Sequence, residues 1–171
     1  RLQFAAGREL RFSSSGDEGL VQAVRGDEFS DSGALEKLGI DPLSEELTIE
    51  LFESLALKNR RSTLKGFLLN QKAIAGIGNE YADEICFQAG VRPDLKMAGL
   101  GKEQLQRLHR YLKRVLRRAT LHSSAAHSDP GWLINSRGSG SSCPRCQRAL
   151  ESRRITGRKT IICPRCQRTC L

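Results

Sequence analysis

Apolar and polar residues alternate over short runs near the start of the chain. Two such runs, 2–4 and 10–12, lie on either side of a Gly7-Arg8 pair, and a third apolar run covers 20–24 after a loop rich in Ser and Gly. Alternation bounded by turn residues is typical of β-strands. The pattern therefore predicts a two- or three-stranded remnant of a sheet.

From about residue 44 the apolar positions recur at helical spacing, which predicts four helices. Ser44 is suited to cap the first helix, and the second should run through 64–68 with Ser62 or Thr63 near its start. Asn79 is expected to cap the third, and Gly90 to end it. The fourth should span about residues 102–119, with an apolar stripe that faces a core and many cations on its remaining surface.

Two identical Cys-Pro-Arg-Cys segments near the C-terminus carry the clearest chemical signal. Cys143 and Cys146 form one C-x-x-C knuckle, and Cys163 and Cys166 form the other. Two knuckles joined by a spacer long enough for a short hairpin are typical of a structural Zn²⁺ site, because together they supply four thiolates. A pair of disulfides is the alternative, but the chain shows no secretory segment.

The remaining cysteines do not extend this pattern. Cys170 lies beyond the second knuckle, and Cys86 lies in a distant apolar stretch. We interpret both as spare thiols, with Cys86 buried as a small hydrophobic residue.

Charge is divided unevenly along the chain. Residues 1–50 carry 5 Lys and Arg against 11 Asp and Glu, whereas residues 51–171 carry 23 against 8. A segment of net charge +15 that also contains a zinc knuckle favours a nucleic-acid partner. Aromatic residues make up only 5% of the chain, which argues against a protein that stacks single-stranded bases.

These patterns predict a mainly α protein with small β parts: strand remnants, a helical bundle and a C-terminal zinc β-hairpin held by four cysteines. No apolar run is long enough to span a membrane, so we expect an intracellular protein. Because Arg1 opens a predicted strand, we also expect a piece of a longer protein. The expected parts are 1–36, a β remnant; 37–121, a helical domain; 122–142, a linker; and 143–171, the zinc finger.

The segment 68–85, which begins Leu-Leu-Asn-Gln-Lys-Ala-Ile-Ala-Gly-Ile-Gly-Asn, closely resembles the helix–two-turns–helix core of the formamidopyrimidine-DNA glycosylase and endonuclease VIII family. The upstream Leu-Gly-Ile-Asp-Pro-Leu-Ser at 38–44 and the knuckles with Gly-Arg-Lys-Thr at 157–160 resemble the same family. The likeness covers roughly residues 38–170 in the family's order. It implies base-excision repair by a DNA glycosylase with AP-lyase activity.

The resemblance also implies which residues bind DNA. Asn79 matches the asparagine that contacts the phosphate backbone beside the lesion, and Arg158 matches the arginine of the zinc finger that also grips phosphate. Lys65 and Lys72 flank the same turn and are weaker candidates for phosphate contacts, with solvated surface as the alternative. The implied partner is double-stranded DNA, damaged or abasic, bound by a monomer.

Residues that the family uses for catalysis are missing from this sequence. The resemblance implies an N-terminal proline nucleophile, an adjacent glutamate and a lysine of a β-domain, and none of these can be located here. The family's Arg-Arg-Phe-Gly plug is replaced by Ser-Ser-Ser-Gly-Asp-Glu-Gly at 13–19. The segment before Cys143 also looks shorter than the loop that covers an everted oxidised purine.

Three hypotheses follow. The chain is the DNA-binding portion of a base-excision glycosylase and AP lyase and does not itself catalyse, or it is a non-catalytic DNA-binding paralogue that has lost its plug and lid. An RNA-binding helix–two-turns–helix module is a third alternative, although that family lacks the zinc hairpin. Whether the whole protein is an enzyme depends on residues that this sequence does not contain.

Overall fold

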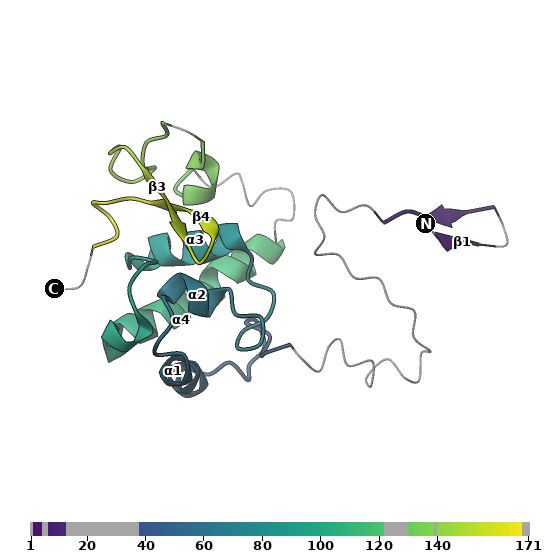
Figure 1. The fold of residues 1–171 in the computed structure, drawn as a ribbon, viewed down its shortest axis with the longest axis horizontal. Coiled ribbons are helices and arrows are strands. Elements are labelled where there is room, and N and C mark those ends of the chain that lie inside the picture. Colours follow the sequence, from purple (N-terminus) through teal and green to yellow (C-terminus); the bar gives the residue numbers. More distant parts are fainter. Residues whose placement is uncertain (1, 5–6, 13–37, 122–129, 139, 169–171) are drawn as a thin grey trace. The chain divides into compact units, whose positions relative to one another are not determined.

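The computed structural model describes residues 2–4, 7–12, 38–121, 130–138 and 140–168 (Figure 1). The chain divides into two compact units, Arg1–Glu36 and Lys37–Leu171. The second unit contains every helix of the described residues and the C-terminal hairpin. The mainly helical architecture with two small sheets confirms the predicted fold class.

The first unit contains a short antiparallel hairpin. Strand β1 (Leu2–Gln3) pairs with β2 (Glu9–Leu10), and Gly7 between them has a positive φ of 72°. A left-handed residue at this turn suits glycine, which has no Cβ. The predicted turn is therefore confirmed, while the predicted strand at 20–24 lies outside the described residues.

Helix α1 (Ile49–Lys58) begins later than its apolar pattern suggests. Its N-cap is Thr48, whose hydroxyl oxygen accepts a hydrogen bond from the Leu51 amide at 3.2 Å. The prediction of a Ser44 cap is wrong, because the Ser44 hydroxyl instead donates to the Asp41 carbonyl at 2.9 Å within a preceding turn.

Helices α2 (Leu64–Leu68) and α3 (Asn79–Ala89) flank the central turn of the unit. Thr63, one of the two residues expected near the start of α2, caps that helix. Asn79 is not the cap of α3, because Gly78 occupies that position and Asn79 is the first helical residue. Gly90 ends α3 in the left-handed conformation, which confirms the predicted stop.

Helix α4 (Lys102–Leu121) follows the 3-10 turn η1 (Met97–Gly99) and runs two residues beyond its predicted end. It packs against α3 and α1. Within the described part of the chain, no helix is both long and apolar enough to cross a bilayer. The buried face of α4 confirms the predicted stripe and consists of Leu108, Leu112, Val115 and Leu116.

The chain closes with a hairpin of β3 (Glu151–Ile155) and β4 (Arg158–Ile162). Its two-residue turn, Thr156-Gly157, has φ values of 50° and 76°, and two consecutive positive φ angles match the twist of a tight β-hairpin. Helix α3 packs against both α4 and β4, and also against the 3-10 turn η3 (Leu133–Ser136) (Figure 1). Helix α3 is therefore the central element of the unit.

A buried ion pair joins the hairpin to the helices. The Lys65 ammonium lies 2.6 Å from Oδ1 of Asp83, and neither side chain has any exposed surface. The same ammonium donates to Oγ1 of Thr160 at 2.7 Å and to the Lys159 carbonyl at 3.0 Å. The second Asp83 oxygen accepts hydrogen bonds from the Ile161 amide and from Arg137. Elements α2, α3 and β4 therefore share one set of charged hydrogen bonds.

This arrangement contradicts both alternatives expected for Lys65, a contact with DNA phosphate or a solvated position on the surface. Burial lowers the pKa of Lys65, while the hydrogen bond to Asp83 opposes that shift and favours the charged form. A cation whose three donors are directed at protein oxygens in the interior is unavailable to a partner.

We predict that Lys65→Met lowers the free energy of unfolding by about 3–5 kcal/mol, because it leaves the buried Asp83 carboxylate without its cation. Urea denaturation followed by circular dichroism measures the change. Lys72→Met, at an exposed position, is the matched control and should stay within about 0.5 kcal/mol of the parent. Equal stabilities of the two variants would contradict a structural role for the pair.

Candidate nucleic-acid interface and metal centre

The amide side chain of Gln71 spans the turn that precedes α3. Oε1 of Gln71 accepts a hydrogen bond from the Gly76 amide at 2.8 Å, and Nε2 of Gln71 donates to the Ile77 carbonyl at 3.0 Å. Gly76 has a φ of 78°, a conformation that glycine adopts without strain. The side chain of Gln71 thus fixes the path of the backbone into α3.

Residues 38–40 pack against this turn through backbone contacts. The Gly39 amide donates to the Gln71 carbonyl at 2.7 Å, and Ile40 forms a parallel bridge with Ile74. A methyl group added at Gly39 would lie 2.4 Å from the carbonyl carbon of Ala73, which no real side chain tolerates. Close backbone packing explains the glycine in this segment.

The outer side of the turn is open. Gly76 and Gly78 are exposed, and a methyl group added at either would meet no atom within 4 Å. Gly78 provides no side chain to cap α3, so the amides of the first turn are not satisfied by a capping side chain. A helix N-terminus with accessible amides and the positive end of the helix dipole favours an anion.

Asn79 connects this turn to the hairpin. Its Nδ2 donates to the Lys159 carbonyl at 3.1 Å, while its Oδ1 is buried without a hydrogen-bond partner. At the tip of the hairpin, Cγ2 of Thr156 lies 3.2 Å from where a methyl group on Gly66 would be. The hairpin therefore rests on α2 and on the start of α3.

The predicted phosphate contacts are partly brought together. Arg158 is exposed and directly precedes Lys159, so its backbone lies beside Asn79 at the edge where the turn meets the hairpin. Lys72 is exposed within the turn. Lys65 is buried behind the same edge, where it donates hydrogen bonds to Lys159 and Thr160 of the hairpin.

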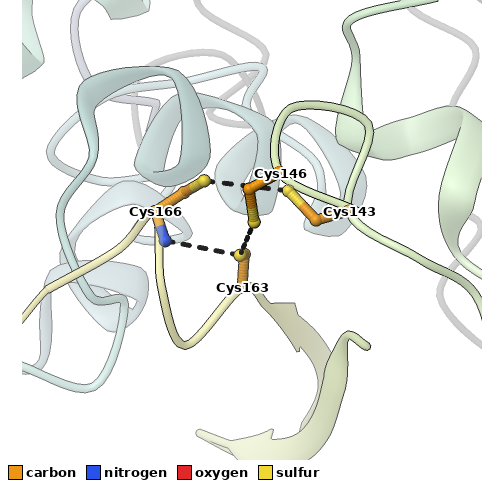
Figure 2. A group of neighbouring side chains, drawn as sticks. All are labelled: Cys143, Cys146, Cys163 and Cys166. Carbon is orange, nitrogen blue, oxygen red and sulfur yellow. Dashed lines mark hydrogen bonds between the residues drawn. The ribbon is translucent and has the colours of Figure 1, made fainter. Parts of the chain in front are cut away.

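Four sulfur atoms gather at the base of the hairpin, and all of them lie within 4.8 Å of one another. Figure 2 shows Cys143 facing Cys166 and Cys146 facing Cys163, with Sγ–Sγ distances of 3.8 and 3.5 Å. Thiolates about 2.3 Å from a tetrahedral ion lie roughly 3.8 Å apart, whereas disulfide sulfurs lie about 2.05 Å apart. The cluster fits one tetrahedral metal ion and does not fit two disulfides.

The electrostatics of the cluster favour a bound cation. A hydrogen bond from the Arg148 amide lowers the pKa of the Cys146 thiol to about 7. Burial raises the pKa values of the Cys163 and Cys166 thiols, and the neighbouring sulfurs raise them further. Four thiolates in such a small volume repel one another, so a divalent cation is needed to ionise them together.

Both knuckles are attached to the C-terminal end of α3. The Arg145 guanidinium lies over the Phe87 ring at 4.4 Å from its centroid and donates to the Phe87 carbonyl at 3.3 Å. In the second knuckle, Gln167 accepts from the Cys163 amide and donates to the Val91 carbonyl. The metal cluster is thereby fixed to the same helix whose N-terminus carries Asn79.

Sequence reasoning missed several of the residues that shape the site. Gln71 lies in the motif, but only its hydrogen bonds to Gly76 and Ile77 show that it orders the turn. Asp83 and Glu84 are buried in α3, and an acid among apolar residues such as Ala82 and Ile85 was a signal that buried partners exist. Cys86 is fully buried, as predicted, and burial raises the pKa of its thiol.

Comparison with known proteins shows which family this chain resembles. Residues 38–128 match the profile described as the formamidopyrimidine-DNA glycosylase H2TH domain. The formamidopyrimidine-DNA glycosylase of Shouchella clausii is 32% identical over 97% of this chain and 64% of its own length. That of Nitratidesulfovibrio vulgaris is 41% identical over 66% of this chain and 34% of its own length.

Solved structures of formamidopyrimidine-DNA glycosylases are similar to this chain in fold. The Lactococcus lactis formamidopyrimidine-DNA glycosylase, non-covalently bound to DNA that contains an AP site, superposes with a TM-score of 0.72 at 26% identity, over 84% of this chain and 54% of that one. The MutM protein of Thermus thermophilus superposes with a TM-score of 0.67 at 34% identity, over 84% of this chain and 58% of that one. The chain thus spans less than two thirds of these relatives. With more than half of its residues in the matching domain and the same fold around it, the chain belongs to the formamidopyrimidine-DNA glycosylase family.

Proposed function

We propose that this chain is the DNA-binding portion of a base-excision-repair glycosylase, and that it grips the backbone of damaged or abasic duplex DNA as a monomer. The observation that carries the proposal is the hydrogen bond from Asn79 to the Lys159 carbonyl, because it joins the glycine turn and the hairpin into one edge. The relatives solved with DNA that contains abasic or damaged sites support the choice of partner.

The physical character of this edge suits a phosphate backbone. Open space over Gly76 and Gly78 lets a rigid polyanion approach the amides of α3. Arg158, exposed on the adjoining hairpin, supplies a planar guanidinium, and such a group binds phosphate through two parallel hydrogen bonds. Lys72, exposed in the same turn, is a further and weaker phosphate contact in this proposal. Phosphate contacts of this kind position a protein on DNA without reading its sequence.

We infer that the four-cysteine cluster holds one structural Zn²⁺. Cys143, Cys146, Cys163 and Cys166 would ligate it, and four protein thiolates leave no open position for substrate or water. The ion would close the base of the hairpin whose tip presents Arg158. Its contribution is therefore to the rigidity of the DNA-binding edge.

The glycosylase and lyase chemistry of the family is assigned to residues outside these 171. The proline and glutamate that the resemblance implies have no counterpart in this sequence. The replaced plug at 13–19 lies outside the described residues, so the non-catalytic paralogue remains the alternative. The sequence that precedes Arg1 in the whole protein separates the two: a Pro-Glu start followed by a β-rich segment with a suitable lysine supports the enzyme.

We predict that Asn79→Ala and Arg158→Ala each weaken binding to abasic duplex DNA by about 1–3 kcal/mol, or roughly 5- to 150-fold in Kd, because each removes a phosphate contact. Fluorescence anisotropy with a labelled duplex at fixed salt measures the affinity. Arg165→Ala is the matched control, since it removes one exposed cation from the same zinc unit away from the hairpin tip.

A thermal melt of each variant accompanies the binding measurement, because Asn79 also contacts the hairpin. Unchanged affinity in both Asn79→Ala and Arg158→Ala, or an equal loss in Arg165→Ala, would remove the proposed edge from the DNA interface.

The metal proposal predicts one zinc ion per chain by elemental analysis of the purified protein. Removal of the ion by a strong chelator should abolish DNA binding and loosen the hairpin, because the four thiols repel one another once the ion is gone. Cys146→Ser should lose zinc in the same assay, whereas Cys86→Ser should retain it, since Cys86 lies in the helical core. Zinc retained after Cys146→Ser and Cys163→Ser together would contradict the assignment.

A polypeptide of these 171 residues should form no covalent adduct with abasic DNA in the presence of borohydride, because it lacks the amine that the family uses as its nucleophile. Denaturing gel electrophoresis detects any trapped complex. A formamidopyrimidine-DNA glycosylase of full length serves as the positive control. A trapped adduct with this polypeptide would contradict the proposal that the catalytic residues lie outside these 171.

A further inference from the structure

A second basic site lies at the opposite end of α3 from Asn79. Between the C-terminal half of α4, the end of α3 and the first cysteine knuckle, the surface encloses a cavity of about 300 Å³. Gln88, at its α3 wall, is nine residues beyond Asn79, or about 13 Å along the helix. The cavity is therefore separate from the edge formed by the glycine turn and the tip of the hairpin.

Three arginines converge on this cavity. Arg114 and Arg118 reach it from α4, and Arg145 reaches it from the first knuckle. Residues four apart on a helix lie on the same face about 6 Å from one another along the axis. Among the described residues that line the cavity there is no Asp or Glu.

The third arginine is held in place before any ligand arrives. The Arg145 guanidinium stacks over Phe87, donates to the Phe87 carbonyl and is hydrogen-bonded to Oε1 of Gln88. Gln88 is in turn hydrogen-bonded to the buried Glu84 carboxylate. A guanidinium fixed in this way loses little side-chain entropy when it binds an anion.

The remaining walls give the cavity a defined shape. Trp132 and Val115 are buried, and Tyr111 is half-buried. A volume of about 300 Å³ exceeds that of a few water molecules, each of which occupies about 30 Å³, and accommodates a tetrahedral oxyanion with part of its hydration.

We propose that Arg114, Arg118 and Arg145 form a binding site for a phosphate group, separate from the DNA-binding edge and independent of the function proposed for it. Three guanidiniums suit the charge and the several acceptor oxygens of phosphate better than a single carboxylate. The phosphate comes from a free ion or from the backbone of a second nucleic-acid segment. The basic surface continues from Arg114 and Arg118 along α4 past Arg110, Lys113 and Arg117.

Trp132 provides a direct reporter, because it is the only tryptophan in the chain and lines the cavity. The full chain is titrated with inorganic phosphate, and separately with a duplex that lacks terminal phosphates, at constant ionic strength maintained with chloride. We expect a saturable change in tryptophan fluorescence with at least one of the two. The midpoint should rise about tenfold or more in Arg114→Gln/Arg118→Gln, as expected for the loss of charge-assisted hydrogen bonds.

The matched control is Lys58→Gln/Arg61→Gln, which removes two exposed cations at the end of α1 and should leave the midpoint unchanged. A response to inorganic phosphate identifies a free ion as the source, and an arginine-dependent response to the duplex alone identifies a nucleic-acid backbone. Absence of a saturable response, or equal shifts in the two double variants, would overturn the proposal. An arginine-dependent response to hexaglutamate alone would also overturn it, because the site would then recognise carboxylates.

Discussion

The Lys65–Asp83 ion pair is the contact on which the arrangement of the larger unit depends. Its two side chains have no exposed surface, and their oxygen and nitrogen partners come from α2, α3 and β4. A charge this deeply buried is tolerated only where every partner is in place, so the three elements have one acceptable relative position. The same constraint places Asn79, at the start of α3, beside the hairpin.

Two sets of contacts hold the hairpin against the helices. The cysteine cluster lies at the base of the hairpin, and Arg145 and Gln167 fix its two knuckles to the end of α3 and to Val91. The ion pair fixes β4 to α2 and to the middle of the same helix. Because α3 receives both attachments and also begins at the open glycine turn, it connects the cysteine cluster to the proposed DNA-binding edge.

Local patterns predicted the helices, the hairpin and the four clustered cysteines because each depends on spacing along the chain. Gly90 as a stop and Thr63 near the start of α2 follow from backbone preferences of single residues. Ser44 and Asn79 failed as caps because other groups engage them, the Asp41 carbonyl in one case and the Lys159 carbonyl in the other. Lys65 was misplaced for the same reason: its partners Asp83 and Thr160 are distant in sequence, and no local pattern encodes them.

The span between Lys65 and Thr160 has a consequence for how the protein folds. These residues are 95 positions apart, so their hydrogen bond closes a long loop and is costly to form early. The hairpin, by contrast, pairs residues only a few positions apart around Thr156-Gly157. Local hairpin formation should therefore precede docking onto α2 and α3, and the β4 partners of Lys65 become available only once the hairpin has formed.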